Sequence, residues 1–105
     1  MKLITVSTTC STIEEAEKLA GQVLGQRLAA CVQITSARSM YWWQQRIASE
    51  NEYLLNMKSR RGLFERLAQT IREHHSYDVP EIVATEIVSV DRQYRQWLVG
   101  ELAER

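Results

Sequence analysis

Hydrophobic and polar residues alternate along the chain in two periods, which predict where strands and helices lie. Residues 3–8 alternate in the manner of a strand that opens a sheet. The compact apolar run at residues 28–34 is bounded by polar residues and predicts a second strand. The β-branched run at residues 82–88 predicts a late strand.

The middle of the chain predicts a long β-hairpin. Residues 39–47 carry three consecutive aromatic side chains, and residues 52–58 alternate like a second strand, so residues 48–51 form the expected turn. Aromatic and aliphatic residues occur on both faces of this hairpin. An isolated chain would therefore expose apolar surface and strand edges. We expect oligomerisation to cover them.

Three segments with helical spacing complete the prediction. Thr12 and Glu15 form a capping-box pattern, and apolar residues then recur on one helical face as far as Gly25. Ser59 is expected to cap a second helix. Asp91 introduces a last helix. The order is then β-α-β-β-α-β followed by a terminal helix.

This order predicts an α+β fold of the ferredoxin-like kind. Such a fold is a sandwich in which helices cover one face of an antiparallel sheet, here with a long central hairpin and a C-terminal helix added. The 105 residues fit one domain, spanning residues 1–105. The sequence contains no internal repeat or linker that would divide it.

The composition and the net charge disfavour some classes of binding partner for this domain. Apolar residues make up 45% of the chain and the formal net charge is zero, so the basic face that nucleic acids or membrane surfaces require is not expected. No stretch reads as a signal peptide or a membrane span. Two cysteines are too few for a disulfide framework. We expect a cytoplasmic protein with no nucleic-acid or membrane partner.

Five short segments resemble motifs of the CutA family of divalent-ion tolerance proteins. They are RLAACV at 27–32, YWW at 41–43, EYLLNMK at 52–58, HSYDVPE at 75–81 and YRQWL at 94–98. Each motif alone is weak. Their common order along nearly the whole chain makes the resemblance strong.

The resemblance implies an assembly and a function. It implies a homotrimer in which the hairpin arms of neighbouring subunits pair edge to edge, as in the PII signalling proteins. It also implies tolerance to copper and other divalent cations through metal binding, with no catalytic activity and no required cofactor. The alternative is a PII-like regulatory module that binds a small anionic effector or a partner protein in clefts between subunits.

Three positions depart from the family pattern. Gln45 stands where glycine is usual, and because the chain lacks a residue that tolerates positive φ there, we expect the hairpin arm to bend differently. Ser76 replaces proline, which predicts a looser turn around His75. Ser59 replaces the usual threonine.

The two cysteines are candidate ligands for soft ions such as Cu(I). Cys31 lies among small apolar residues, where a buried, inert thiol is the alternative. Cys10 lies in a Ser/Thr-rich loop before the first helix. Amides at that helix N-terminus would lower its pKa, and we expect it to be the more accessible thiol.

Two adjacent histidines stand at the end of the second helix. The side chains of His74 and His75 diverge by about 100° in helical geometry, so at most one of them faces a shared pocket. His75 matches the histidine of the family motif, and its imidazole suits Cu(II) or Zn(II). The alternative is a favourable interaction with the helix dipole, which we prefer for His74.

Polar and amphipathic residues of the matched motifs are candidates for lining a cleft between subunits. They are Tyr41, Trp43, Glu52, Lys58, Tyr77 and Glu81. Glu52 and Lys58, six residues apart on one strand, lie about 20 Å apart, so a single site that uses both needs neighbouring chains. Hydrogen bonding and ion pairing within an interface are an equal alternative for these residues.

Other proteins with this fold carry chemistry that the chain lacks. An acylphosphatase needs an arginine in the loop after the first strand, and residues 7–11 contain none. A ferredoxin-like copper chaperone needs C-x-x-C there, and only Cys10 is present. An RNA-binding domain would show exposed aromatics in a basic setting. Local motifs supply no nucleophile, base and orienting group, so we do not expect an enzyme.

Overall fold

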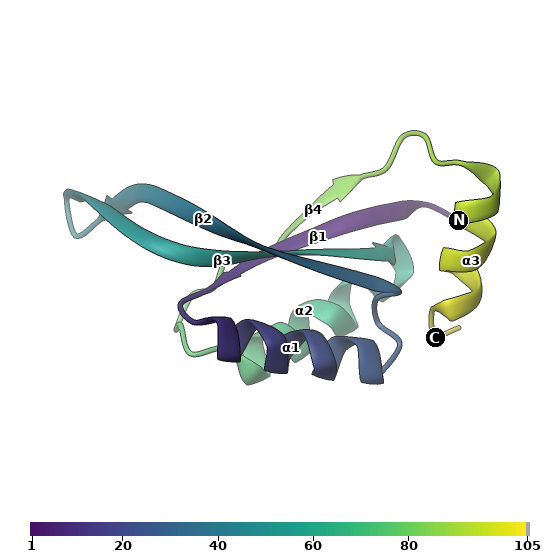
Figure 1. Cartoon of the computed structure of the whole chain (residues 1–105), viewed down its shortest axis with the longest axis horizontal. Coiled ribbons are helices and arrows are strands. Elements are labelled where there is room, and N and C mark those ends of the chain that lie inside the picture. Colours follow the sequence, from purple (N-terminus) through teal and green to yellow (C-terminus); the bar gives the residue numbers. More distant parts are fainter. Residues whose placement is uncertain (105) are drawn as a thin grey trace.

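A four-stranded antiparallel sheet with the strand order β2-β3-β1-β4 forms one layer of the molecule (Figure 1). The computed structural model describes residues 1–104. In chain order the elements are β1 Leu3–Cys10, α1 Ile13–Gly25, β2 Cys31–Trp43, β3 Arg46–Arg60, the 3-10 turn η1 Arg61–Leu63, α2 Phe64–His74, β4 Val83–Glu86 and α3 Arg92–Glu101. The order and the single helical layer confirm the predicted ferredoxin-like α+β class.

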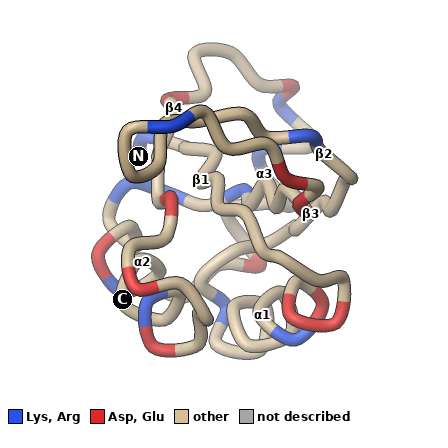
Figure 2. The backbone as a smooth tube through the Cα atoms, turned by 90° about the vertical axis from the view of Figure 1, so that its left-hand side faces the viewer, with Lys and Arg blue, Asp and Glu red and all other residues tan. Residues whose placement is uncertain are grey.

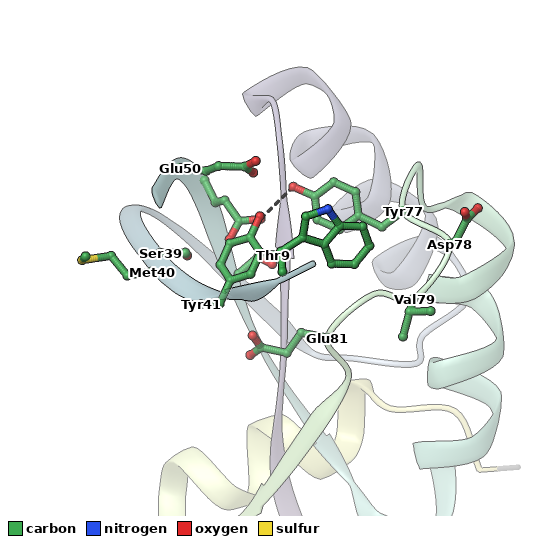
Figure 3. A pocket seen from close by; sticks show the side chains of 11 residues that line it. Thr9, Ser39, Met40, Tyr41, Glu50, Tyr77, Asp78, Val79 and Glu81 are labelled. Carbon is green, nitrogen blue, oxygen red and sulfur yellow. Dashed lines mark hydrogen bonds between the residues drawn. The ribbon is translucent and has the colours of Figure 1, made fainter. Parts of the chain in front are cut away.

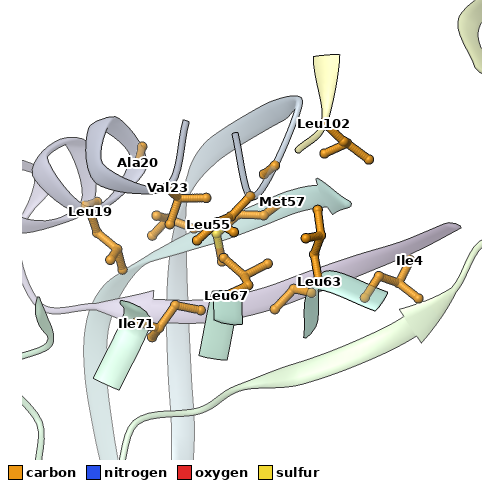
Figure 4. Close-up of a cluster of buried hydrophobic side chains, with 14 of the residues drawn as sticks. Ile4, Leu19, Ala20, Val23, Leu55, Met57, Leu63, Leu67, Ile71 and Leu102 are labelled. Atoms are coloured by element: carbon orange, nitrogen blue, oxygen red, sulfur yellow. The ribbon is translucent and has the colours of Figure 1, made fainter. Parts of the chain in front are cut away.

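Helices α1 and α2 cover one face of the sheet, and the hydrophobic core lies between the two layers (Figures 1 and 4). Its fully buried side chains come from both helices and from the two central strands, and they include Leu19, Val23, Leu55, Met57, Leu67 and Ile71. Burying such a side chain stabilises the fold by roughly 1.5–3 kcal/mol each. Helix α3 lies past one end of the sheet and contributes Leu98 to the same core.

Two helix caps form as the sequence predicts. The Thr12 hydroxyl accepts a hydrogen bond from the Glu15 amide (3.1 Å) at the start of α1. The Asp91 carboxylate accepts bonds from two amides in the first turn of α3. Ser59 is not a cap, contrary to expectation. It is buried in β3, where its hydroxyl donates to the Leu28 carbonyl (2.6 Å), and η1 intervenes before α2.

Strands β2 and β3 form a continuous ladder from Cys31↔Lys58 to Trp43↔Arg46, and their far end projects beyond the helical layer as an arm (Figure 1). The runs at 28–34 and 39–47 therefore belong largely to one long strand. The predicted turn at 48–51 is wrong, because the chain reverses at Gln44–Gln45 and residues 48–51 lie inside β3. The late strand is also shorter than the run at 82–88 suggested.

The turn at the arm's tip keeps left-handed backbone at both central positions. Gln44 has φ 50° and Gln45 has φ 65°. Two-residue hairpin loops of this kind match the twist of the flanking strands. Gln45 thus adopts the left-handed conformation that we expected only a residue such as glycine to tolerate. A non-glycine residue pays about 1–2 kcal/mol for this backbone.

Large apolar side chains remain exposed on the arm. They are Met40, Trp42, Trp43 and Ile47, each more than 60% exposed. Elsewhere charge is mixed, and Figure 2 shows acidic and basic positions on both the sheet and the helices. Within residues 1–104 no helix has the length and apolar character needed to cross a membrane. The arm is thus the surface that most needs a cover in water.

Replacing Gln45 with glycine tests the strained turn. We expect Gln45→Gly to raise the free energy of unfolding by up to about 1 kcal/mol, because glycine adopts positive φ without steric cost. Guanidinium unfolding at one fixed protein concentration measures it. The matched control is Ser36→Gly, at an exposed β2 position where φ is not positive. This variant should lower the free energy of unfolding. Equal destabilisation by both variants would contradict this account of the turn.

Candidate functional site

Cys10 is the last residue of β1 and is fully buried, so the prediction of an accessible, acidified thiol is wrong. Its pKa is raised to about 12, chiefly by burial and then by the negative charges of Glu15 and Glu52. The side chain points into the protein before α1 begins, and burial outweighs any effect of the helix N-terminus. At neutral pH Cys10 is therefore a protonated thiol.

Glu15 lies in the first turn of α1 and reaches across to the segment that follows α2. Its carboxylate accepts hydrogen bonds from the Ser76 amide (2.8 Å) and the Ser76 hydroxyl (3.1 Å). Burial raises the pKa of Glu15, but these bonds and the nearby His75 ring outweigh it, so the pKa lies below its usual value. Glu15 is therefore a firmly ionised carboxylate.

Ser76 tightens the turn that it was expected to loosen. A proline at this position has no amide hydrogen to donate, whereas Ser76 provides both an amide and a hydroxyl to Glu15. The departure from the family motif thus adds two bonds between the end of α2 and the start of α1. These bonds fix Glu15 beside His75.

His75 directly follows α2 and has a buried imidazole whose two nitrogens have separate partners. Nε2 lies 2.7 Å from the Thr9 carbonyl, and Nδ1 lies 3.0 Å from the Tyr77 amide. A carbonyl only accepts and an amide only donates, so the network assigns the proton of a neutral ring to Nε2. Nδ1 is then the lone-pair nitrogen, and it lies 3.9 Å from Glu15 Oε2.

His74 does not join this group. Its Nδ1 lies 3.0 Å from the Thr70 carbonyl of its own helix. The two histidines therefore have separate partners, but His75 has extended backbone after α2, so the helical geometry assumed for the pair does not apply to it.

Cys10, Glu15 and His75 offer three ligand atoms that lie within 4.8 Å of one another. The ligand atoms of a tetrahedral zinc-sized ion, with bonds of about 2.0–2.3 Å, are separated by roughly 3.3–3.8 Å. The cluster would hold such an ion after a contraction of roughly 1 Å. Sequence reasoning placed Cys10 and His75 among the ligands but missed Glu15, whose only visible signal was its capping-box spacing from Thr12.

Cys31 lies away from this cluster. It pairs with Lys58, whereas Cys10 pairs with Tyr53, five residues along β3. The separation along the strand is about 16 Å, and the odd offset puts the two thiols on opposite faces of the sheet. Cys31 is half-buried beside Tyr94, whose pKa is raised by burial and then by the neighbouring thiol. It cannot share an ion with Cys10 or His75 of the same chain.

A second feature is a cavity of about 720 Å³ between the hairpin arm and the loop after α2 (Figure 3). Its lining consists of Thr9, Ser39, Met40, Tyr41, Trp43, Glu50, Glu52, Tyr77, Asp78, Val79 and Glu81. Five of the six candidate cleft residues are among them. Lys58 is the exception, since it lies farther along β3 and donates to Gln33 (2.9 Å). The residues that line this cavity all belong to one chain.

The charged residues that line this cavity are all acidic. The Tyr77 hydroxyl donates to Glu52 Oε2 over 2.7 Å, shown by the dashed line in Figure 3. Burial and then this carboxylate raise the pKa of Tyr77. Partial burial, followed by Glu50, raises the pKa of Tyr41. Four of the lining residues are acidic and none is Lys, Arg or His, so a small anionic effector is disfavoured here.

Similarity to known proteins extends over nearly the whole chain. The family model described as CutA1 divalent ion tolerance protein matches residues 4–101. A divalent-cation tolerance protein CutA from Pyrococcus horikoshii is 37% identical over 94% of this chain and 97% of its own length. A chloroplastic CutA 1 from Oryza sativa is 35% identical over 96% of this chain and 58% of its own.

Solved structures show the same fold. Crystalline CutA1 from Oryza sativa superposes with a TM-score of 0.96 at 34% identity, covering 100% of this chain and 97% of that one. CutA1 from Pyrococcus horikoshii superposes with a TM-score of 0.92 at 36% identity, covering 96% and 99%. A structure described as the periplasmic divalent cation tolerance protein CutA from Archaeoglobus fulgidus has a TM-score of 0.92 at 29% identity, covering 94% and 97%.

Acid titration of stability tests the ionised Glu15. Its folded-state pKa lies below the usual 4.5, so its stabilising contribution is complete above that value and is lost as pH falls through the folded-state pKa. We expect Glu15→Gln to lower the free energy of unfolding by about 1 kcal/mol at pH 7. The difference from the unmodified protein should shrink below pH 4.5.

The control for this titration is Glu14→Gln, an exposed carboxylate in the same helical turn. It loses the same interaction with the helix dipole but no bond to Ser76. Unfolding by urea from pH 3 to pH 7 gives both curves. Parallel curves for the two variants would show that the Ser76 bonds contribute nothing.

Proposed function

This chain belongs to the CutA1 divalent ion tolerance protein family, and from that premise we propose that it binds copper or another divalent transition-metal ion at Cys10, Glu15 and His75. The observation that carries the proposal is the convergence of a thiol, a carboxylate and an imidazole within 4.8 Å. A mixed set of this kind suits borderline ions such as Cu(II) and Zn(II), whereas Mg²⁺ and Ca²⁺ prefer oxygen ligands.

The orientation of His75 supports this role. Histidines that ligate metals usually donate their other ring hydrogen to a carbonyl or carboxylate, which fixes the ring and makes the free nitrogen more basic. Here Nε2 donates to Thr9, which leaves Nδ1 toward Glu15. Binding an ion at Nδ1 requires the Tyr77 amide to give up its bond.

Protonation of Cys10 sets the pH dependence of this binding. A thiol with a pKa of about 12 must release its proton when a metal ion binds to the sulfur. Affinity therefore rises with pH below that value, by about tenfold per unit if one proton is released. A protonated, buried thiol is also a poor nucleophile, so we assign a binding role and no catalysis.

We further propose that the working form is a homotrimer in the cytoplasm, in which neighbouring chains cover the arm and a partner protein can dock. The exposed apolar side chains of the arm support the assembly. The free thiols support a reducing compartment. Cys31 lies too far from Cys10 to bind the same ion, so any ion that Cys31 binds occupies a separate site.

Calorimetric titration with Cu(II) and Zn(II) tests the metal site. We expect each of Cys10→Ser and His75→Ala to weaken binding at least tenfold, because each removes one of three ligands. Cys31→Ser is the matched cysteine control and should bind like the unmodified protein. Circular dichroism confirms that each variant is folded. Unchanged affinity in a Cys10→Ser, His75→Ala double variant would refute the assignment of these residues as metal ligands.

Light scattering at micromolar concentration tests the assembly. We expect a single species with the mass of three chains. Replacing both Met40 and Trp42 with serine removes exposed apolar surface from the arm without touching the core, and should shift the population toward smaller species. A stable monomer of the unmodified chain would refute the trimer.

A further inference from the structure

The two carboxylate oxygens of Glu15 meet different donors. Oε1 accepts a hydrogen bond from the Ser76 hydroxyl (3.1 Å) and a longer one from the Ser11 hydroxyl (3.4 Å). Oε2 accepts a bond from the Ser76 amide (2.8 Å). A carboxylate has about four lone-pair sites, two on each oxygen. Two hydroxyl groups from separate segments of the chain therefore compete for the lone pairs of Oε1.

Oε2 is the oxygen of Glu15 that lies beside the imidazole of the candidate metal site. It is 3.9 Å from His75 Nδ1. Ligand atoms around one tetrahedral zinc-sized ion are separated by roughly 3.3–3.8 Å, so these two atoms already stand close to the spacing that a shared ion needs. Oε2 is therefore the oxygen placed to bind an ion together with His75.

Burial makes these protein donors effective. The side chain of Glu15 is 16% exposed and that of His75 is 0% exposed, so water has little access to the carboxylate. Hydrogen bonds to a charged group are stronger than those between neutral groups. The donors from Ser11 and Ser76 therefore decide which lone pairs of Glu15 remain available to an ion.

The number of carboxylate oxygens that bind an ion depends on the size of the ion. Zn(II) in proteins takes four ligands in a tetrahedron, whereas larger divalent ions take more ligands and bind carboxylates through one or both oxygens. Cd(II) is larger than Zn(II) but also binds thiolate and imidazole well, because it is the softer ion. A comparison of these two ions therefore isolates the binding mode of Glu15 from the chemistry of Cys10 and His75.

We propose that the hydroxyls of Ser11 and Ser76 restrict Glu15 to binding an ion through Oε2 alone, so that the site favours small ions over larger ions of similar chemistry. This inference rests on the proposed metal site. The two serines contact Glu15 and not the ion, so they are positioning residues that set metal specificity. A proline at position 76, as in the family motif, has neither a hydroxyl nor an amide hydrogen for this role.

Separate calorimetric titrations of the full-length protein with Zn(II) and with Cd(II) test the proposal. In a Ser11→Ala, Ser76→Ala variant, Oε1 loses both hydroxyl donors, while the Ser76 amide still holds Oε2. We expect the ratio of Cd(II) affinity to Zn(II) affinity to rise by about threefold or more, the effect of one hydrogen bond. X-ray absorption of the Cd(II) complex should show one more oxygen ligand in the variant than in the unmodified protein.

The matched control is Ser89→Ala, which removes a hydroxyl from an exposed position before α3 and should leave the affinity ratio unchanged. Circular dichroism confirms that each variant is folded. An unchanged or lower ratio in the Ser11→Ala, Ser76→Ala variant, including equal weakening of both ions, would overturn this inference and leave the metal site itself standing. Absence of Zn(II) binding by the unmodified protein would instead refute the metal site, and this inference with it.

Discussion

The part-buried hydrogen bond from His75 Nε2 to the Thr9 carbonyl joins the residue after α2 to the end of β1, and the arrangement of Cys10, Glu15 and His75 depends on it. It fixes the tautomer of the ring and so directs Nδ1 toward Glu15. It also places Ser76 and Tyr77 where their amides meet Glu15 and the ring. Together with the Ser76 bonds to Glu15 and the Tyr77 bond to Glu52, this bond fixes the segment after α2 against α1 and the sheet.

The two candidate sites lie on either side of that segment and recruit different chemistry. Toward α1, a protonated thiol, an ionised carboxylate and an imidazole converge, which suits a borderline transition-metal ion. Toward the arm, the Tyr77 hydroxyl donates a hydrogen bond to Glu52. Carboxylates and aromatic rings surround an open cavity on that side. The Tyr77 amide contacts the metal-site histidine while its hydroxyl contacts the cavity carboxylate. Metal binding at Nδ1 therefore disturbs a residue that the cavity also uses.

Local signals in the sequence predicted two helix caps and the order of the elements, but not the turn of the hairpin or the cluster of Cys10, Glu15 and His75. The Thr12 and Asp91 caps act within one turn, so spacing alone revealed them. The turn at Gln44–Gln45 was missed because it lacks the asparagine or glycine that usually marks positive φ. The cluster brings together residues 10, 15 and 75, and nothing local joins them. Only the resemblance to a family singled out His75, and neither the resemblance nor spacing revealed that Ser76 holds Glu15.

X-ray absorption spectroscopy of the protein loaded with one equivalent of Zn(II) tests the central claim most directly, because it identifies the atoms bound to the ion. The account predicts one sulfur at about 2.3 Å together with nitrogen and oxygen at about 2.0–2.2 Å, the distances of thiolate, imidazole and carboxylate ligands. The sulfur should disappear in Cys10→Ser and remain in Cys31→Ser. A shell of oxygen and nitrogen alone in the unmodified protein would contradict the account.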